Sequence, residues 1–310
     1  MLKQLSLFGL LVVSNAASAV NLTTDLYGKF NVSRDFLEAR DDEWLSNASR
    51  IGVRGNYSIS ETLRIVYQLE QDVDLMHGGT NIDTLFSMRN SFVGLRNNLG
   101  RVIFGAHDSP LKMSQGKVDQ FNDTLGDVKD NFVGEVRATD AFMYNSPKFG
   151  KGFQFNAMYL DSDSHFDSSQ SYSLTYKHEN LYLAAAYDDD MRKNDRTASR
   201  TLAFDSYRAV AQYTWGDLKI GALIQSSEAQ NVLGAKRQES IMVSGAWKYQ
   251  DFSFRAQYGD SDIVIEDLQL ISLGIDFHLN KQVRLYVNGY DRKVSSDSLK
   301  AVELGAEYKF

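Results

Sequence analysis

Residues 252–258 read Phe252-Ser253-Phe254-Arg255-Ala256-Gln257-Tyr258, with an apolar or aromatic side chain at every second position and a polar one at most positions between. This period of two is typical of a β-strand with one apolar and one polar face, because successive side chains of a strand point to opposite sides. The same alternation runs through residues 172–177 and 302–310. No amphipathic helical repeat of comparable length competes with it, so the sequence predicts an all-β protein.

Polar turns divide the chain into strands that can be counted. Seven short connections lie near residues 60–62, 97–100, 149–152, 179–180, 216–217, 250–251 and 279–281. Eight longer, charge-rich segments alternate with them at 37–48, 75–85, 109–140, 162–170, 189–204, 227–239, 261–268 and 293–300. These connections join sixteen strands. An even number brings both chain ends to the side of the short turns, where the last strand can pair with the first.

The composition excludes several classes of protein. The chain has 310 residues, no cysteine, and 33 basic against 40 acidic residues, which gives a net charge of −7. A disulfide framework, a zinc-thiolate site and a cysteine nucleophile are therefore excluded, and a basic nucleic-acid-binding protein is not expected. No metal or other cofactor is predicted either.

The N-terminus has the features of an export signal. Lys3 precedes an apolar run over residues 5–13, and small residues end at Ala17-Ser18-Ala19. This pattern predicts a signal peptide over residues 1–19, cleaved after Ala19, and a β-barrel domain over residues 20–310. Beyond the leader no apolar stretch reaches the roughly 18 residues of a membrane-spanning helix.

A closed barrel is the form in which an exported sheet of this kind can enter a membrane, because lipid offers no hydrogen-bond partner to a sheet edge. Aromatic side chains recur at both ends of the strands, as in the girdles of membrane barrels. The sequence therefore predicts a 16-stranded antiparallel transmembrane β-barrel in the bacterial outer membrane, with short periplasmic turns and long extracellular loops. Its polar inner face predicts a water-filled interior.

Several short motifs, in this order and spacing, resemble the Gram-negative general (non-specific) porin family. They are Asp25–Lys29, Ser49–Gly55, Arg89–Leu95, Gly100–Gly105 and Arg137–Gly152, followed by the terminal Phe310. The resemblance implies a homotrimer in contact with outer-membrane lipids and lipopolysaccharide. It also implies a channel for passive diffusion of ions and small hydrophilic solutes, and recognition of the last strand, ending in Phe310, by the barrel-assembly machinery.

By the same resemblance, the long segment 109–140 contains the third loop, folded inward to narrow the pore. Its acidic residues are the expected constriction-loop carboxylates: Asp119, Asp123, Asp127, Asp130 and Glu135. They would face a pore-lining basic wall made of Lys29, Arg50, Arg54, Arg64 and Arg89. Two positions depart from the family pattern, Ala106 in place of an arginine and Asp140 in place of an asparagine. Together with the net acidity, the missing arginine at Ala106 predicts a weak preference for cations.

Two other classes of function stay open at this point. A surface-exposed adhesive or structural barrel would use the charged loops to bind partners, with its pore blocked. An outer-membrane hydrolase would need a histidine with acidic or serine partners. The five histidines, at positions 77, 107, 165, 178 and 278, show no spacing of a metal site or catalytic triad.

Overall fold

The computed structural model describes residues 21–310 except 39, 78–84, 163–166, 193–201, 231, 233, 263–267 and 295–296. The predicted signal peptide, residues 1–19, lies outside the described residues. The strands of the first half are β1 (Leu22–Leu37), β2 (Glu43–Ser46), β3 (Arg50–Ser58), β4 (Arg64–Val73), β5 (Phe86–Met88), β6 (Ser91–Asn97), β7 (Gly100–Asp108), β8 (Arg137–Asn145) and β9 (Phe153–Leu160). Those of the second half are β10 (Ser169–His178), β11 (Leu181–Arg192), β12 (Ala203–Trp215), β13 (Leu218–Ala229), β14 (Gln238–Tyr249), β15 (Phe252–Ser261), β16 (Leu268–His278), β17 (Val283–Val294) and β18 (Asp297–Lys309).

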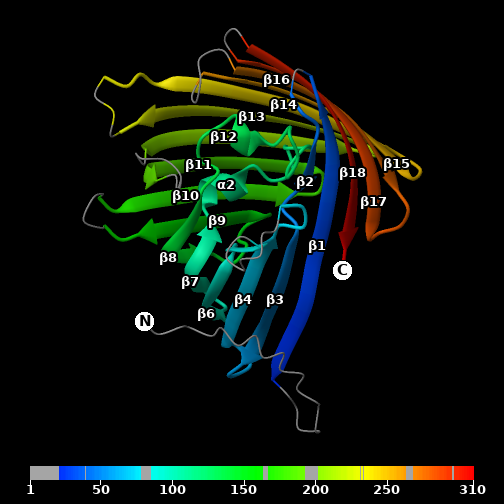
Figure 1. Cartoon of the computed structure of the whole chain (residues 1–310). Helices are drawn as coiled ribbons and strands as arrows, with labels where there is room; N and C mark the ends of the chain where they lie inside the picture. Colours follow the sequence, from blue (N-terminus) through cyan, green and yellow to red (C-terminus); the bar gives the residue numbers. More distant parts are fainter. Residues whose placement is uncertain are drawn as a thin grey trace, which may run out of the picture.

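These segments form one antiparallel barrel of sixteen strands, as the sequence predicts (Figure 1). Two strands are each interrupted once, so that eighteen segments appear. β2 and β3 are separated at residues 47–49, and β5 and β6 at residues 89–90. Breaks of this kind re-aim the side chains beside them, and both lie next to the site described below.

Pairing of the first and last strands closes the barrel. β1 pairs with β18 in the register Lys29↔Lys309 to Leu37↔Ala301. Two further backbone hydrogen bonds join Gly28 and Phe310, at 3.0 and 3.1 Å. The sheet therefore has no free edge along this seam, which is the condition for a β-structure in lipid.

The two faces of the wall differ sharply in polarity. On β16, Leu273 and Ile275 are 58% and 46% exposed, whereas the flanking Ser272 and Asp276 are 0% and 3% exposed. The same pattern continues around the barrel, where large apolar side chains are exposed on the outside. Polar side chains point inward, so the interior is the hydrophilic side of this protein.

The segment between β7 and β8, residues 109–136, is here called loop 3 and lies inside the ring of strands (Figure 1). It carries α2 (Pro110–Ser114) and the short 3₁₀ turn η1 (Val128–Asp130). Five of its apolar side chains are at most 1% exposed: Leu111, Val118, Phe121, Val128 and Phe132. All of these except Leu111 belong to apolar clusters with side chains of the inner wall. Among the described residues, no helix is long and apolar enough to cross a membrane.

Candidate functional site

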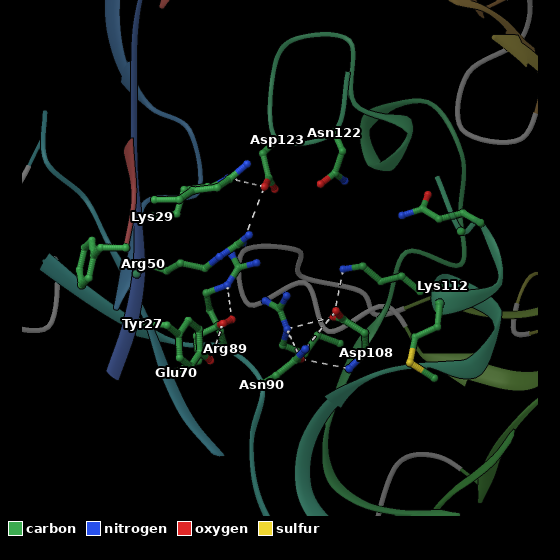
Figure 2. Close-up of a pocket in the computed structure, with 17 residues that line it drawn as sticks. Tyr27, Lys29, Arg50, Glu70, Arg89, Asn90, Asp108, Lys112, Asn122 and Asp123 are labelled. Atoms are coloured by element: carbon green, nitrogen blue, oxygen red, sulfur yellow. Dashed lines mark hydrogen bonds and ion pairs between the residues drawn. The ribbon is translucent and has the colours of Figure 1, made fainter. Parts of the chain in front are cut away.

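A cavity of about 510 Å³ lies between the tip of loop 3 and the barrel wall. Figure 2 shows Lys29 and Arg50 entering it from one side and Lys112 from the other. Six cations and three carboxylates line it: Lys29, Arg50, Arg89, Lys112, Arg137 and Lys309, with Glu70, Asp108 and Asp123. The lumen is therefore narrowed at a place where charged groups dominate.

Asp123 is the carboxylate of the loop tip that reaches the wall. Its Oδ2 lies 2.6 Å from Lys29 Nζ and 3.6 Å from Arg50 Nη1. Burial alone raises the pKa of the Asp123 carboxyl, but Lys29 and Arg50 outweigh it and hold the pKa below its usual value. Asp123 has a φ of 65°, a left-handed conformation that aspartate and asparagine tolerate better than most residues.

Arg89 stands at the interruption between β5 and β6 and is held by two carboxylates of β4. Its Nε donates to Glu70 Oε1 at 2.8 Å, and its Nη1 donates to Asp72 Oδ1 at 3.1 Å. Tyr27 also donates its hydroxyl to Glu70, at 2.9 Å. The charge of Arg89 is thus largely compensated within the wall itself.

The opposite side of the cavity is formed by Asp108 at the end of β7. Its Oδ1 lies 3.2 Å from Lys112 Nζ and 3.0 Å from Arg137 Nε. Lys112 is placed there by α2, which begins after Ser109; the Ser109 hydroxyl caps the helix by accepting from the Lys112 backbone N–H at 3.1 Å. Asp108, Lys112 and Arg137 were not among the site residues predicted from the sequence. The Ser109-Pro110 pair, an N-cap followed by proline at N1, is the signal that could have revealed the helix.

Of the predicted basic wall, Lys29, Arg50 and Arg89 line this cavity, whereas Arg54 and Arg64 do not. The Arg54 side chain is 58% exposed, lies 3.9 Å from Asp25 and stacks over the Tyr27 ring. Arg64 stands at the first position of β4, directly opposite Arg96 of β6.

The other predicted loop carboxylates are placed differently from Asp123. Asp119 and Asp127 are turned into loop 3, where each accepts two backbone N–H groups at 2.8 to 3.0 Å. Burial and the neighbouring Asp127 raise the pKa of Asp119 to about 7. Glu135 points to the wall and accepts from Arg208 Nη1 at 2.7 Å. The side chain of Asp130 lies outside the described part of the chain.

The positions that depart from the resembled family lie at an irregularity between β7 and β8, where the register shifts between Gly105 and His107. Ala106 is 3% exposed. Asp140 is exposed and adopts a φ of 54°. Neither of them lines the cavity.

Loop 3 is anchored to the wall by polar contacts as well as by its apolar side chains. Besides Glu135, Arg208 also binds the Val133 carbonyl, at 3.3 Å. At the tip, Gln257 Nε2 donates to the Gly126 carbonyl at 3.1 Å. These contacts tie the tip and the C-terminal part of the loop to β15 and β12, which fixes the width of the constriction.

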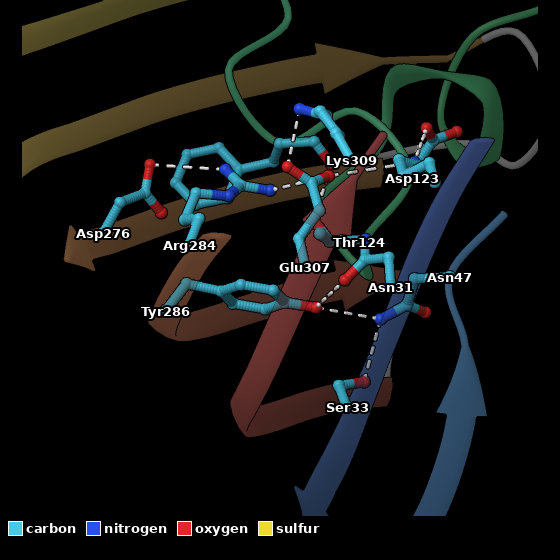
Figure 3. A network of polar contacts seen from close by, with 12 residues as sticks. Asn31, Ser33, Asn47, Asp123, Thr124, Asp276, Arg284, Tyr286, Glu307 and Lys309 are labelled. Atoms are coloured by element: carbon cyan, nitrogen blue, oxygen red, sulfur yellow. Dashed lines mark hydrogen bonds and ion pairs between the residues drawn. The ribbon is translucent and has the colours of Figure 1, made fainter. Parts of the chain in front are cut away.

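Lys29 also lies near Glu307, which belongs to a chain of ion pairs along the inner wall. Figure 3 shows its members Asp276, Arg284, Glu307 and Lys309. Glu307 lies 2.6 Å from Lys309, 3.3 Å from Arg284 and 4.0 Å from Lys29. Arg284 also binds Asp276, at 3.3 Å. In this chain of ion pairs, each carboxylate contacts two or more cations, so the side chains are held in fixed positions beside the lumen.

Comparison with known proteins agrees with the barrel fold. The family model described as Gram-negative porin matches residues 6–298. The chain belongs to the Gram-negative porin family. The family and its relatives place this porin in the bacterial outer membrane.

Among the relatives is the major outer membrane protein P.IB of Neisseria gonorrhoeae, 26% identical over 235 residues, which cover 68% of this chain and 66% of the relative. The chain spans 40 to 66% of the length of the first curated relatives it matches. An anion-selective porin from Comamonas acidovorans has a similar fold, with a TM-score of 0.74, 18% identity, and coverage of 93% of this chain and 100% of that one. OmpT of Vibrio cholerae, in a trimer form, gives a TM-score of 0.72 at 18% identity, with coverage of 93% and 99%.

Proposed function

We propose that this porin is a non-enzymatic, water-filled channel for passive diffusion of ions and small hydrophilic solutes down their gradients. The observation that supports this most directly is the closed barrel with a polar inner face, narrowed by loop 3 at a charged constriction. Fixed charges beside a pore select ions by sign, while bore and hydrogen-bonding groups select solutes by size and polarity.

The channel prefers anions in this proposal, which reverses the cation preference predicted from the net charge of the chain. The lining of the constriction carries twice as many cations as carboxylates. A neighbouring cavity, lined in part by the other side of the loop tip, has eight Lys or Arg and five Asp or Glu in its lining. Acidic residues elsewhere make the net charge of the chain negative. Salt screens the field of these remote charges over about 10 Å, so they have little effect on ions in the lumen.

In the membrane we expect a homotrimer, because a porin-fold relative is described in a trimer form. The exposed apolar wall suits contact with outer-membrane lipids and lipopolysaccharide. Phe310, which joins the last strand to Gly28, is proposed as the residue read by the barrel-assembly machinery.

The hydrolase alternative has one contact in its favour, since Ser253 Oγ lies 3.0 Å from His278 Nε2. A hydrolase would cleave an ester such as p-nitrophenyl acetate and would lose that activity in Ser253→Ala. We expect the wild-type protein to hydrolyse the ester no faster than the Ser253→Ala variant does.

Insertion of the purified protein into a planar lipid bilayer tests the proposed function. The expected result is a stepwise rise of current in KCl, in which each inserted channel assembly adds a current step of the same size. A protein that folds and inserts but produces no steps, as expected for a plugged adhesive barrel, would contradict it.

A further inference from the structure

Three arginines stand side by side near the short-turn end of the barrel. In the strand register, Arg64 of β4 is directly opposite Arg96 of β6, and Arg96 is directly opposite Arg101 of β7. Directly paired residues of adjacent antiparallel strands have Cβ atoms about 5 Å apart, and like charges in such pairs are destabilising. A row of three therefore needs a compensating group.

A second cavity, of about 640 Å³, opens beside this row, between loop 3 and the short turn that joins β8 to β9. Arg96, Arg101, Lys148 and Lys177 line it, and its described lining contains no carboxylate. The rest of the lining is largely neutral and polar, including Asn145. This distinguishes it from the constriction, where carboxylates accompany the cations.

Arg101 of this row also differs from two buried arginines of the lumen, Arg208 and Arg255. Arg208 binds Glu135 at 2.7 Å, and Arg255 binds Asp276 at 2.7 Å. Arg101 instead donates its Nε to a neutral acceptor, Asn145 Oδ1, at 2.8 Å. Its position is therefore fixed while its positive charge is left uncompensated by that contact.

The floor of the cavity continues this neutral network. Asn145 donates to Asn156 at 2.8 Å, and Asn156 donates to the Ser173 hydroxyl at 3.1 Å. Asn145 and Asn156 are 7% and 6% exposed. The Asn145 amide thus holds Arg101 at the edge of the cavity, where its guanidinium also lies over the Phe92 ring, 5.4 Å from the ring centroid, without an acidic partner in these contacts.

We propose that this cavity, lined by Arg96, Arg101, Lys148 and Lys177, is a binding site for the phosphate group of small phosphorylated solutes on their way through the pore. The proposal rests on the channel function proposed above and adds a solute class to it. A phosphate carries a charge of about −1.5 to −2 at neutral pH and three acceptor oxygens, which match two guanidinium groups flanked by lysines. The cavity faces the lumen, so dissolved phosphate can reach it and lipid head groups cannot.

Phosphate block of the chloride current tests the site. Inorganic phosphate at pH 7.5 is added to bilayers that contain the wild-type channel in KCl, with acetate at equal ionic strength as the monovalent comparison. We expect phosphate to lower the chloride current at concentrations where acetate does not. In the double variant Arg96→Gln/Arg101→Gln, the half-blocking phosphate concentration should rise by roughly tenfold or more, since contacts to charged groups are lost.

A second pair of variants tests the site independently, in case the double variant does not fold. Lys148 and Lys151 lie in the same exposed turn, but only Lys148 lines the cavity. Lys148→Gln should raise the half-blocking concentration by about fivefold, the effect of one unit charge at about 4 Å in water. Lys151→Gln should leave it unchanged.

The outcomes separate this proposal from the channel function. A wild-type channel that conducts KCl but is blocked by phosphate no better than by acetate would overturn the phosphate site and leave the channel intact. Equal effects of Lys148→Gln and Lys151→Gln would also overturn it. Absence of any conductance would instead refute the proposed function.

Discussion

Asp123→Asn is the substitution that most directly probes the charge of the constriction. It removes the loop-tip carboxylate that lies 2.6 Å from Lys29 and 3.6 Å from Arg50. Asparagine keeps the shape of the side chain and tolerates the φ of 65° at this position, so the backbone of the loop need not change. The variant therefore changes one charge and leaves the bore nearly as it was.

The expected size of the effect follows from the cavity. If the volume of about 510 Å³ is treated as a sphere, an ion at its centre lies about 5 Å from the wall, where one unit charge contributes about 0.8 kcal/mol in water. Screening in 0.1 M salt lowers this to about 0.5 kcal/mol. The contribution has opposite signs for anions and cations, so the ratio of anion to cation permeability should rise about fivefold.

The assay is the reversal potential of the open channel in a tenfold KCl gradient. Asp123→Asn should move it further toward the chloride equilibrium potential. The control is Asp251→Asn, the same change on an exposed short turn, which should leave the potential unmoved. An unchanged potential in Asp123→Asn, or a shift toward cations, would refute the assignment of Asp123 to the constriction.

Three further predictions concern the anchoring of loop 3, the packing of the wall and the pH. Glu135→Gln leaves Arg208 buried without its carboxylate, so it should lower the free energy of unfolding by about 3–5 kcal/mol and increase the current noise of the open channel. Thermal unfolding in detergent and single-channel recordings check these two effects. An unchanged temperature of unfolding would contradict the prediction. Gly305→Ala places a Cβ 2.1 Å from the Tyr286 ring and should lower the free energy of unfolding by about 1–3 kcal/mol. The control is Gly289→Ala, where no atom lies within 4 Å of the new Cβ, and its temperature of unfolding should be higher than that of Gly305→Ala. Because the folded pKa of Asp123 lies below its unfolded value near 4, its charge is complete at pH 7 and is lost only as the pH falls through the folded value. As the pH falls from 7 through this folded value, anion preference should therefore rise more in the wild type than in Asp123→Asn, and a rise of equal size in both would contradict the assignment of Asp123 to the constriction.

The fold could be predicted almost completely from the sequence. A strand with one face toward lipid and one toward water has to alternate, and its short turns need Gly, Asn or Asp, so strand number and order can both be deduced. The interruptions at residues 47–49 and 89–90 could not, because the alternation continues on both sides of each break.

The site could be predicted only in part. Lys29 and Arg50 lie on strands, where position along the chain determines the side that a residue faces, and Arg89 stands at the break between β5 and β6. Loop 3 has no such period. Asp119 and Asp127 bind backbone N–H groups of their own loop, as aspartates in turns often do, and a count of acidic residues cannot separate them from Asp123.

Swelling of liposomes that contain the purified protein shows whether the barrel encloses an open aqueous pore. The proteoliposomes are placed in isotonic solutions of uncharged sugars of increasing size. An open pore should give rapid swelling in the smallest sugar and a steady fall in rate as the sugars grow. Proteoliposomes with correctly folded protein that swell no faster than protein-free ones in every sugar would contradict it.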